Sequence, residues 1–168
     1  MGDEKASYRL EVSRRIAAGP AAIFAVLRDP RGHVAIDASG MLMESTGDAV
    51  SAVGDSFVVH MDRDALRDVP MGEYDVTVLI VTYDQDREIA WSVGMTADAQ
   101  FGHVYGYRLE PGDGGTLVTL YYDWSGIPEP VKDRGIFPVV PESALRATLG
   151  ILARTVAPGA TRPGATPS

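Results

Sequence analysis

Six strand-type segments follow one another between Met41 and Trp124, and no long helical pattern interrupts them. Each contains alternating or β-branched apolar residues and is bounded by turn residues. They span residues 41–45, 56–61, 73–83, 88–95, 103–109 and 116–124. The clearest turn is Pro111-Gly112-Asp113-Gly114-Gly115, which predicts a hairpin between the last two segments. Because strands joined by such short connections pair antiparallel, this series predicts an antiparallel sheet.

Helical patterns flank the series of strands on both sides. A further strand is expected over residues 8–16, and Gly19-Pro20 then begins a helix that Asp29-Pro30 ends. A second short helical turn is expected over residues 32–38. A longer helix over residues 144–156 has an apolar stripe formed by Leu145, Leu149, Leu152 and Val156. The order β-α-α-β6-α, with about seven strands and the helices separate from them, predicts an α+β fold.

The composition narrows the classes of function. The chain has 168 residues, which is the size of one domain, and its net charge of −8 argues against nucleic-acid binding and electrostatic membrane anchoring. It has no cysteine, which excludes disulfides, thiolate catalysis and zinc or iron–sulfur sites built on cysteine. Since it shows neither an apolar leader nor a long apolar run, we expect a cytoplasmic monomer or homodimer without stable membrane insertion.

The two ends of the chain differ from the rest. Residues 157–168 are rich in Pro and Gly and lack large apolar side chains, so we expect a disordered tail. Residues 1–6 are expected to be flexible for the same reason. The ordered domain is therefore expected over residues 7–156.

Two stretches carry a family resemblance, RRIAAGPAAIFAVLRDPRGHVAIDASG and GYRLEPGDGGTLVTLYYDW. Together with the order of elements, they resemble the START-like (SRPBCC) superfamily, which includes the birch pollen allergen and the polyketide cyclase/dehydrase and lipid-transport proteins. The resemblance covers residues 7–156. It implies a helix-grip fold, in which a curved sheet wraps a long C-terminal helix and leaves an internal cavity. It also implies that this cavity binds a hydrophobic or amphipathic small molecule.

Alternation along the central strands assigns side chains to faces. The residues predicted to face the cavity are Trp91, Val93, Tyr105, Tyr107, Leu120, Tyr122 and Trp124, together with Leu145, Leu149 and Leu152 of the last helix. Met95 shares the face of Trp91, whereas Arg108 and Asp123 are expected on the convex, solvated face. The aromatic set suits a polycyclic or acyl ligand, although plain core packing explains the same pattern. A slip of one residue would reverse any of these assignments.

Four side chains are candidates for catalysis. His103 shares the face of Tyr105, and its ordinary pKa near neutrality suits a general acid or base; the alternative is a solvent-exposed histidine at a strand end. Tyr105 or Tyr122 could donate a proton. Arg14 interrupts the apolar stripe of the first strand, so it must reach solvent or a carboxylate, or face the cavity and stabilise enolate charge.

Other polar patterns carry less information. His60 and Asp62 share a strand face, but no third ligand is visible and no metal site is predicted. His33 lies four residues before Asp37, either as a surface pair or at the cavity mouth. The glycines after Pro111 precede another strand and so form a turn rather than a dinucleotide loop, and we expect no cofactor.

Three functions agree with these observations. The first is binding or transport of a hydrophobic or amphipathic small molecule, either a lipid or a polyketide-like compound. The second is a polyketide cyclase or aromatase that uses the cavity His, Tyr and Arg groups. The third is a partner-binding module of the co-chaperone or toxin type, with contacts at residues 62–72 and 136–140. The cavity portal is expected between two irregular loops, residues 62–72 and 128–141.

Overall fold

The computed structural model describes residues 8–64 and 72–157, which contain one sheet of seven antiparallel strands and four helices. The strands are β1 (Arg9–Ile16), β2 (Leu42–Thr46), β3 (Ser56–Asp62), β4 (Glu73–Asp84), β5 (Glu88–Thr96), β6 (Ala99–Gly112) and β7 (Gly115–Asp123). Their order in the sheet is β1-β7-β6-β5-β4-β3-β2, so β1 and β2 are the edges. The predicted α+β class and strand series are confirmed.

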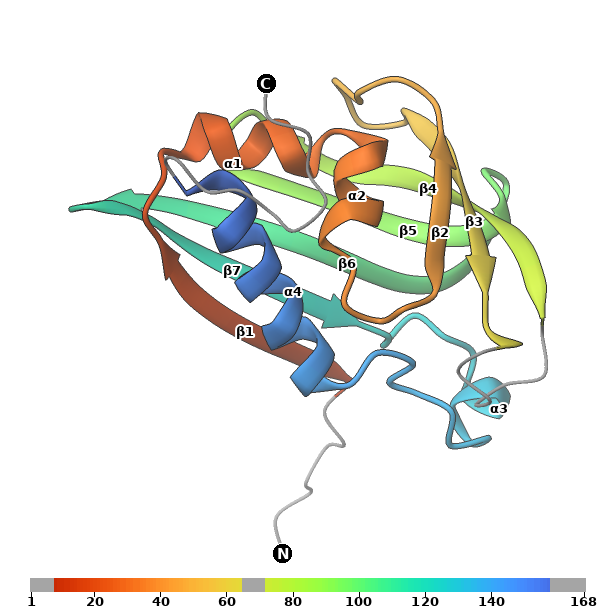
Figure 1. The fold of residues 1–168 in the computed structure, drawn as a ribbon. Coiled ribbons are helices and arrows are strands. Elements are labelled where there is room, and N and C mark those ends of the chain that lie inside the picture. The colour runs from red at the N-terminus through yellow and green to blue at the C-terminus, as the bar shows by residue number, and fades with distance from the viewer. Residues whose placement is uncertain (1–7, 65–71, 158–168) are drawn as a thin grey trace, which may run out of the picture.

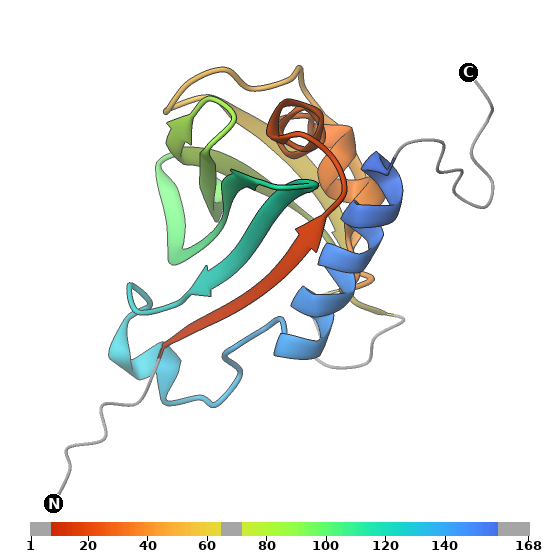
Figure 2. The same cartoon turned by 90° about the vertical axis from the view of Figure 1, so that its left-hand side faces the viewer.

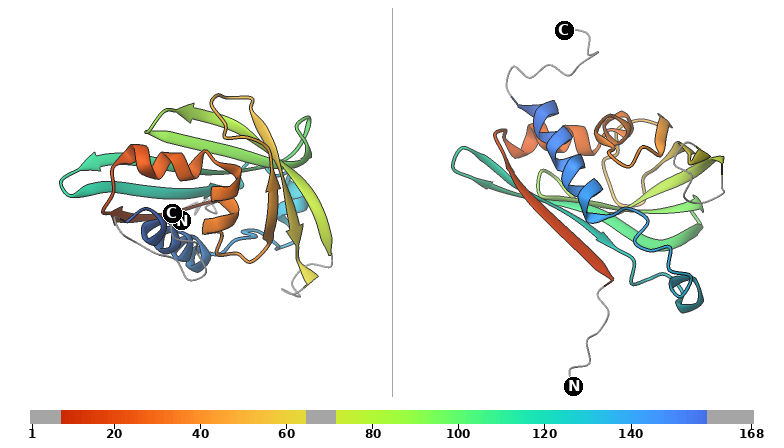
Figure 3. Two further views of the ribbon diagram at one scale, coloured as in Figure 1. Left: turned by 45° about the horizontal axis from the view of Figure 1, so that its top comes forward. Right: turned by 60° about the horizontal axis from the view of Figure 1, so that its bottom comes forward.

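Three of the four helices lie against the concave face of the curved sheet, and the short third helix lies beyond the end of β7 (Figures 1 and 2). The helices are α1 (Pro20–Leu27), α2 (Pro30–Ile36), α3 (Glu129–Lys132) and α4 (Glu142–Val156). The C-terminal helix α4 packs on β1 and β7 and also contacts α1 and α2. Figure 3 shows α4 lying diagonally across one side of the sheet, which is the helix-grip arrangement.

The hairpin between β6 and β7 forms where the glycine-rich turn predicts it. Gly112 pairs with Gly115, which leaves Asp113 and Gly114 as a two-residue loop. Gly114 has a φ of 78°, a backbone conformation that costs glycine little because it has no Cβ. The turn thereby sets the register that places Tyr105 directly opposite Tyr122.

The helices differ from the prediction at four places. Asp29 caps the next helix as well as following α1. Its carboxylate accepts a hydrogen bond from the Arg31 backbone N–H at 3.0 Å, so α2 begins at Pro30. α2 ends at Ile36. α3 is a short helix within a segment expected to be irregular, and α4 begins at Glu142, two residues earlier than predicted.

The register of β5 departs from strict alternation at its C-terminal end. Its pairing with β6 shifts between Ser92 and Gly94 and again between Gly94 and Thr96. Met95, which alternation places on the face of Trp91, lies at this end of the strand and is 54% exposed.

The predicted flexible N-terminus (1–6) and nearly all of the predicted tail (157–168) lie outside the described residues, as do residues 65–71. Within the described ranges, no helix is long and apolar enough to cross a membrane.

Candidate functional site

A cavity of about 480 Å³ lies between the concave face of the sheet and the helices. Most of its lining is apolar or aromatic and comes from β3 to β7, the α1–α2 region, the segment before α4 and α4 itself. The volume falls within the range of about 300–1,000 Å³ that small-molecule sites occupy. The exposed residues Phe101, Arg134 and Ile136 also line it, so the cavity reaches the molecular surface there.

Part of the predicted set lines this cavity. Those that do are Trp91, Val93, Tyr105, Tyr107, Leu120 and Leu145. Tyr122, Trp124, Leu149 and Leu152 are buried but are not part of the wall, which corrects the prediction for these four. Leu149 and Leu152 belong to the buried core beneath α4, which packs on β1 and β7 and contacts α1 and α2. Tyr122 and Trp124 are covered by neighbouring rings.

Stacked aromatic rings cross three strands along the cavity wall. Trp91, Tyr105 and Tyr122 occupy directly opposed positions on β5, β6 and β7. The Trp91 and Tyr105 rings are 6.0 Å apart and nearly parallel, and Tyr105 and Tyr122 stack at 4.2 Å. Trp124, two residues after Tyr122, contacts the Tyr122 ring at a centroid distance of 5.2 Å. Of this row, Trp91 and Tyr105 form part of the cavity wall and give it flat aromatic surface.

His103 lines the cavity, and the hydroxyl of Tyr122 contacts its ring. Its Nδ1 atom lies 2.9 Å from the Tyr122 hydroxyl, and its side chain is buried. Burial lowers the pKa of His103 to about 4, because the charged imidazolium loses its hydration. The histidine is therefore neutral at physiological pH, and the alternative of a solvent-exposed strand-end histidine does not hold.

The tyrosines are also held in their neutral form. Burial, followed by the neighbouring Tyr122, raises the pKa of Tyr105 well above its usual value. Burial likewise raises the pKa of Tyr107, and it raises the pKa of Tyr122 to about 12. These hydroxyls keep their protons at neutral pH and act as hydrogen-bonding groups within an apolar wall.

His33 belongs to the site, as one of the two sequence alternatives proposes. It is buried, and its Nε2–H donates to the Leu27 carbonyl at 2.8 Å while its ring meets Trp91 edge-on at 4.5 Å. Burial lowers its pKa to about 4 despite the hydrogen bond to Leu27, which acts in the opposite direction. Its helix packs closely on α1 because Gly32 has no Cβ to collide with the Val26 carbonyl.

Several wall residues escaped the sequence reasoning. Alternation on β3 and β4 could have identified Val59, Met61, Val76 and Val78. No periodic signal marks those that come from loops: Met41, Arg63, Phe137 and Val139. Arg63 is buried, and its Nη1 donates to the Met41 sulfur. Asp37, another wall residue, accepts hydrogen bonds from the backbone N–H groups of Ser39 and Gly40 in the turn after α2.

Arg14 lies away from the cavity. It is exposed and is not part of the wall. It shares alternation with Val12 and Ile16, but β1 is an edge strand, so the long side chain can extend past the free edge into solvent. The candidate role in stabilising ligand charge therefore finds no support in the geometry.

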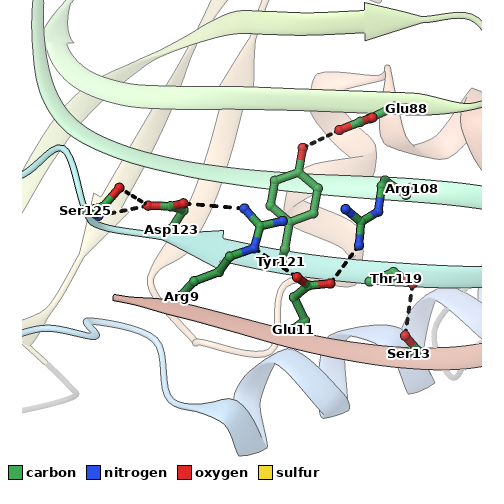
Figure 4. Close-up of polar contacts among 9 residues, drawn as sticks. All are labelled: Arg9, Glu11, Ser13, Glu88, Arg108, Thr119, Tyr121, Asp123 and Ser125. Atoms are coloured by element: carbon green, nitrogen blue, oxygen red, sulfur yellow. Dashed lines mark hydrogen bonds and ion pairs between the residues drawn. The ribbon is translucent and has the colours of Figure 1, made fainter. Parts of the chain in front are cut away.

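Arg108 and Asp123 lie on the convex face, where a polar network surrounds Tyr121 (Figure 4). Glu11 binds Arg9 at 2.9 Å and Arg108 at 2.7 Å, and Asp123 receives a longer contact from Arg9. Both guanidinium groups lie over the Tyr121 ring, whose hydroxyl donates to Glu88 at 2.7 Å. The sheet separates this network from the cavity, and the network links side chains of β1, β5, β6 and β7 on the outer surface.

His60 bonds two acids across the β3–β4 ladder rather than pairing with Asp62. Its Nδ1 lies 2.8 Å from Asp75 and its Nε2 3.2 Å from Glu73. These carboxylates raise the pKa of His60. Both ring nitrogens are engaged, and no group of three or more metal-ligating side chains occurs in the part of the chain that the structure describes.

Comparison with known proteins agrees with this architecture. A family model described as polyketide cyclase/dehydrase and lipid transport matches residues 7–157. The chain belongs to this family. In this family member, the cavity wall contains the stacked rings of Trp91 and Tyr105 and a neutral histidine, His103. No curated protein matches the sequence.

Solved structures share the fold of this family member at low sequence identity. A protein from Rhodobacter sphaeroides has a TM-score of 0.62 at 18% identity, over 92% of this chain and 94% of its own. Truncated norcoclaurine synthase from Thalictrum flavum has a TM-score of 0.58 at 18% identity, over 88% of this chain and 92% of its own. The Aha1 dimer from Colwellia psychrerythraea has a TM-score of 0.57 at 15% identity, over 91% of this chain and 98% of its own. Likeness at this identity shows the fold alone.

Proposed function

We propose that this protein binds a hydrophobic or amphipathic small molecule, a lipid or a polyketide-like compound, in the cavity between the sheet and the helices. The observation that carries the proposal is the cavity of about 480 Å³ with a mostly apolar and aromatic wall. Sites of this size with a few polar groups suit small molecules that bury most of their surface. The family description, which names lipid transport, agrees with this function.

Binding is favoured over acid–base catalysis by the protonation states of the wall residues. A general acid or base works best when its pKa lies near the working pH. The pKa of His103 is about 4 and that of Tyr105 lies well above 10, so neither group exchanges protons readily near neutrality. A cyclase reaction is therefore the weaker proposal, and any chemistry would use these groups as neutral hydrogen-bond donors.

The ligand is proposed to enter beside the segment before α4. Exposed Ile136 and Arg134 line the cavity there, as does exposed Phe101 of β6. This is one side of the portal that the sequence suggests; most of the other, residues 65–71, lies outside the described residues. A partner-binding role, by contrast, has no support beyond the shared fold.

Two measurements on the purified full-length chain test this function. Native mass spectrometry, followed by organic extraction and mass analysis, should show a small apolar molecule bound to part of the sample. The neutral fluorophore N-phenyl-1-naphthylamine should bind saturably at one site and be displaced by that extracted molecule. Absence of any bound molecule together with non-saturable fluorescence would count against the proposal.

A further inference from the structure

Three polar atoms of the cavity wall have no hydrogen-bond partner within the part of the chain that the structure describes. They are the indole N–H of Trp91, the hydroxyl of Tyr107 and Nδ1 of His33, and all three side chains line the cavity. None of these atoms is enclosed: among the described residues, the unpaired side-chain nitrogen or oxygen that lacks accessible surface is His103 Nε2. Because the three side chains are otherwise buried, their accessible polar atoms open on the cavity.

The three side chains form one group around the indole of Trp91. The His33 ring meets the indole edge-on at a centroid distance of 4.5 Å, and the Tyr107 ring stacks on it at 5.7 Å. Trp91 and Tyr107 lie on the neighbouring strands β5 and β6, and His33 comes from α2. Two strands and a helix thus bring the unpaired atoms to one part of the cavity wall.

A hydrogen bond shows which nitrogen of His33 carries the proton. Nε2 lies 2.8 Å from the Leu27 carbonyl oxygen, which can only accept, so Nε2 is the donor. The buried ring is neutral at physiological pH, because burial lowers the pKa of His33 to about 4. Nδ1 therefore holds a lone pair and is a hydrogen-bond acceptor. A ligand carbonyl, ether or hydrocarbon has no proton to offer it.

The polar atoms of this group call for a particular partner. Nδ1 of His33 accepts a hydrogen bond, whereas the Trp91 N–H donates one and the Tyr107 O–H can donate another. A hydroxyl group has the complementary set, because it has one proton to donate and two lone pairs that accept. A carboxylate has no proton for Nδ1 and would lose its hydration against an apolar wall.

We infer that His33, Trp91 and Tyr107 form a polar subsite that binds a hydroxyl group, and that the ligand is a neutral, mostly apolar alcohol or phenol. This inference rests on the proposed binding function and adds the chemical class of the ligand to it. The remaining apolar and aromatic wall contacts the body of the ligand.

The test compares three probes with the same ring system: 2-naphthol, which donates and accepts, 2-methoxynaphthalene, which only accepts, and naphthalene, which does neither. Their dissociation constants are measured by titration calorimetry on the full-length wild-type chain and on single variants. Because ratios of constants are compared between proteins, differences in the hydration of the probes cancel.

His33→Gln tests the acceptor. The glutamine amide N–H can keep the bond to Leu27, but nothing replaces Nδ1. We expect the ratio of the constants for 2-naphthol and 2-methoxynaphthalene to shift about tenfold toward the ether. The matched control is His60→Gln, on the outer surface, which should leave the ratio unchanged.

Tyr107→Phe tests one of the donors. The substitution keeps the ring on Trp91 and removes only the hydroxyl, so 2-naphthol should weaken about tenfold relative to naphthalene. The matched control is Tyr121→Phe, whose hydroxyl bonds Glu88 on the outer face of the sheet, and it should bind the probes as the wild type does.

A further readout needs no variant. Long-range ¹H–¹⁵N spectra of the wild-type protein should show His33 Nδ1 as an unprotonated nitrogen whose resonance moves when 2-naphthol binds and stays in place with naphthalene. A co-purifying molecule supports the inference when it carries a hydroxyl group.

Three results overturn the inference and leave cavity binding intact: equal ratios in wild type and His33→Gln, an Nδ1 resonance that bound 2-naphthol does not move, or a co-purifying ligand without a hydroxyl group. If no probe binds and no molecule co-purifies, the proposed function fails and the inference with it.

Discussion

Nδ1 of His103 lies 2.9 Å from the hydroxyl of Tyr122, so a residue at the cavity wall is held by one buried behind it. The two come from neighbouring strands, and the β6–β7 hairpin sets their relative position. This contact orients the imidazole and selects its tautomer, in the way that partners of a histidine generally do. The position of a cavity-wall side chain thus depends on a residue that is not part of the wall.

Tyr122→Phe should disturb that selection while preserving the fold. The substitution keeps the ring that stacks on Tyr105 but leaves Nδ1 without its partner, so we expect a loss of about 1–3 kcal/mol in the free energy of unfolding. Long-range ¹H–¹⁵N spectra should show His103 as a mixture of tautomers. The control is Tyr121→Phe, the adjacent residue on the opposite face, which loses only its bond to Glu88. Unchanged His103 nitrogen shifts in Tyr122→Phe would contradict the role assigned to the hydroxyl.

The three histidines should separate clearly in an NMR pH titration. His60 is expected to titrate above its usual pKa of 6.5, because Asp75 and Glu73 stabilise its charged form. His33 and His103 should stay neutral until about pH 4, because burial disfavours their charged forms. Titration of either buried histidine near pH 6.5 would show that its ring reaches water.

The same burial makes the free energy of unfolding depend on pH. His33 and His103 have folded-state pKa values of about 4, below the 6.5 of an unfolded histidine, so between these values the unfolded chain binds more protons. The contribution of these two histidines to the free energy of unfolding is therefore fully present above pH 6.5 and is lost as the pH falls toward 4. Each histidine contributes a slope on the order of 1 kcal/mol per pH unit in this window. Urea unfolding at pH 7, 6 and 5 measures it, and a flat profile would contradict the assignment.

Filling the cavity should abolish binding without unfolding the protein. Val76 and Val118 are both buried, but only Val76 lines the cavity. Val76→Phe therefore has space for the larger ring and should keep stability within about 1 kcal/mol while weakening N-phenyl-1-naphthylamine binding at least tenfold. Val118→Phe has no such space and should lose about 1–3 kcal/mol through overpacking. Equal destabilisation of the two variants would mean that the cavity is not available volume.

The fold was largely predictable because its signals are local. Alternation placed Trp91, Tyr105 and Tyr107 on the inner face, and the Asp113-Gly114 turn fixed the last hairpin. Alternation does not show which part of that face a helix covers. Leu149 and Leu152 therefore looked equivalent to Leu145, although both are fully buried in the core and, of the three, only Leu145 reaches the cavity.

The site was less predictable because its polar features are non-local. Arg14 looked like a cavity group because period-two alternation cannot show that β1 is an edge strand. The neutral state of His103 depends on burial and on Tyr122, nineteen positions away, so its ordinary pKa gave the wrong impression of a general acid or base. Phe137 and Val139 enter the wall from a segment without periodicity.

The network on the convex face should stabilise the sheet weakly and only at low salt. Glu11→Gln weakens both guanidinium contacts at once, yet Glu11, Arg9 and Arg108 have side chains that are 42%, 36% and 41% exposed. Solvent screens pairs this exposed, so we expect a loss of no more than about 1 kcal/mol at low ionic strength that disappears near 1 M salt. Glu142→Gln, which removes the exposed pair with Arg146 on α4, is the matched control and should lose less than about 0.5 kcal/mol.

N-phenyl-1-naphthylamine binding should be unaffected in both variants, because the sheet separates the network from the cavity. A loss of binding in Glu11→Gln would mean that the convex face helps to shape the cavity wall through Tyr121 and its neighbour Tyr122.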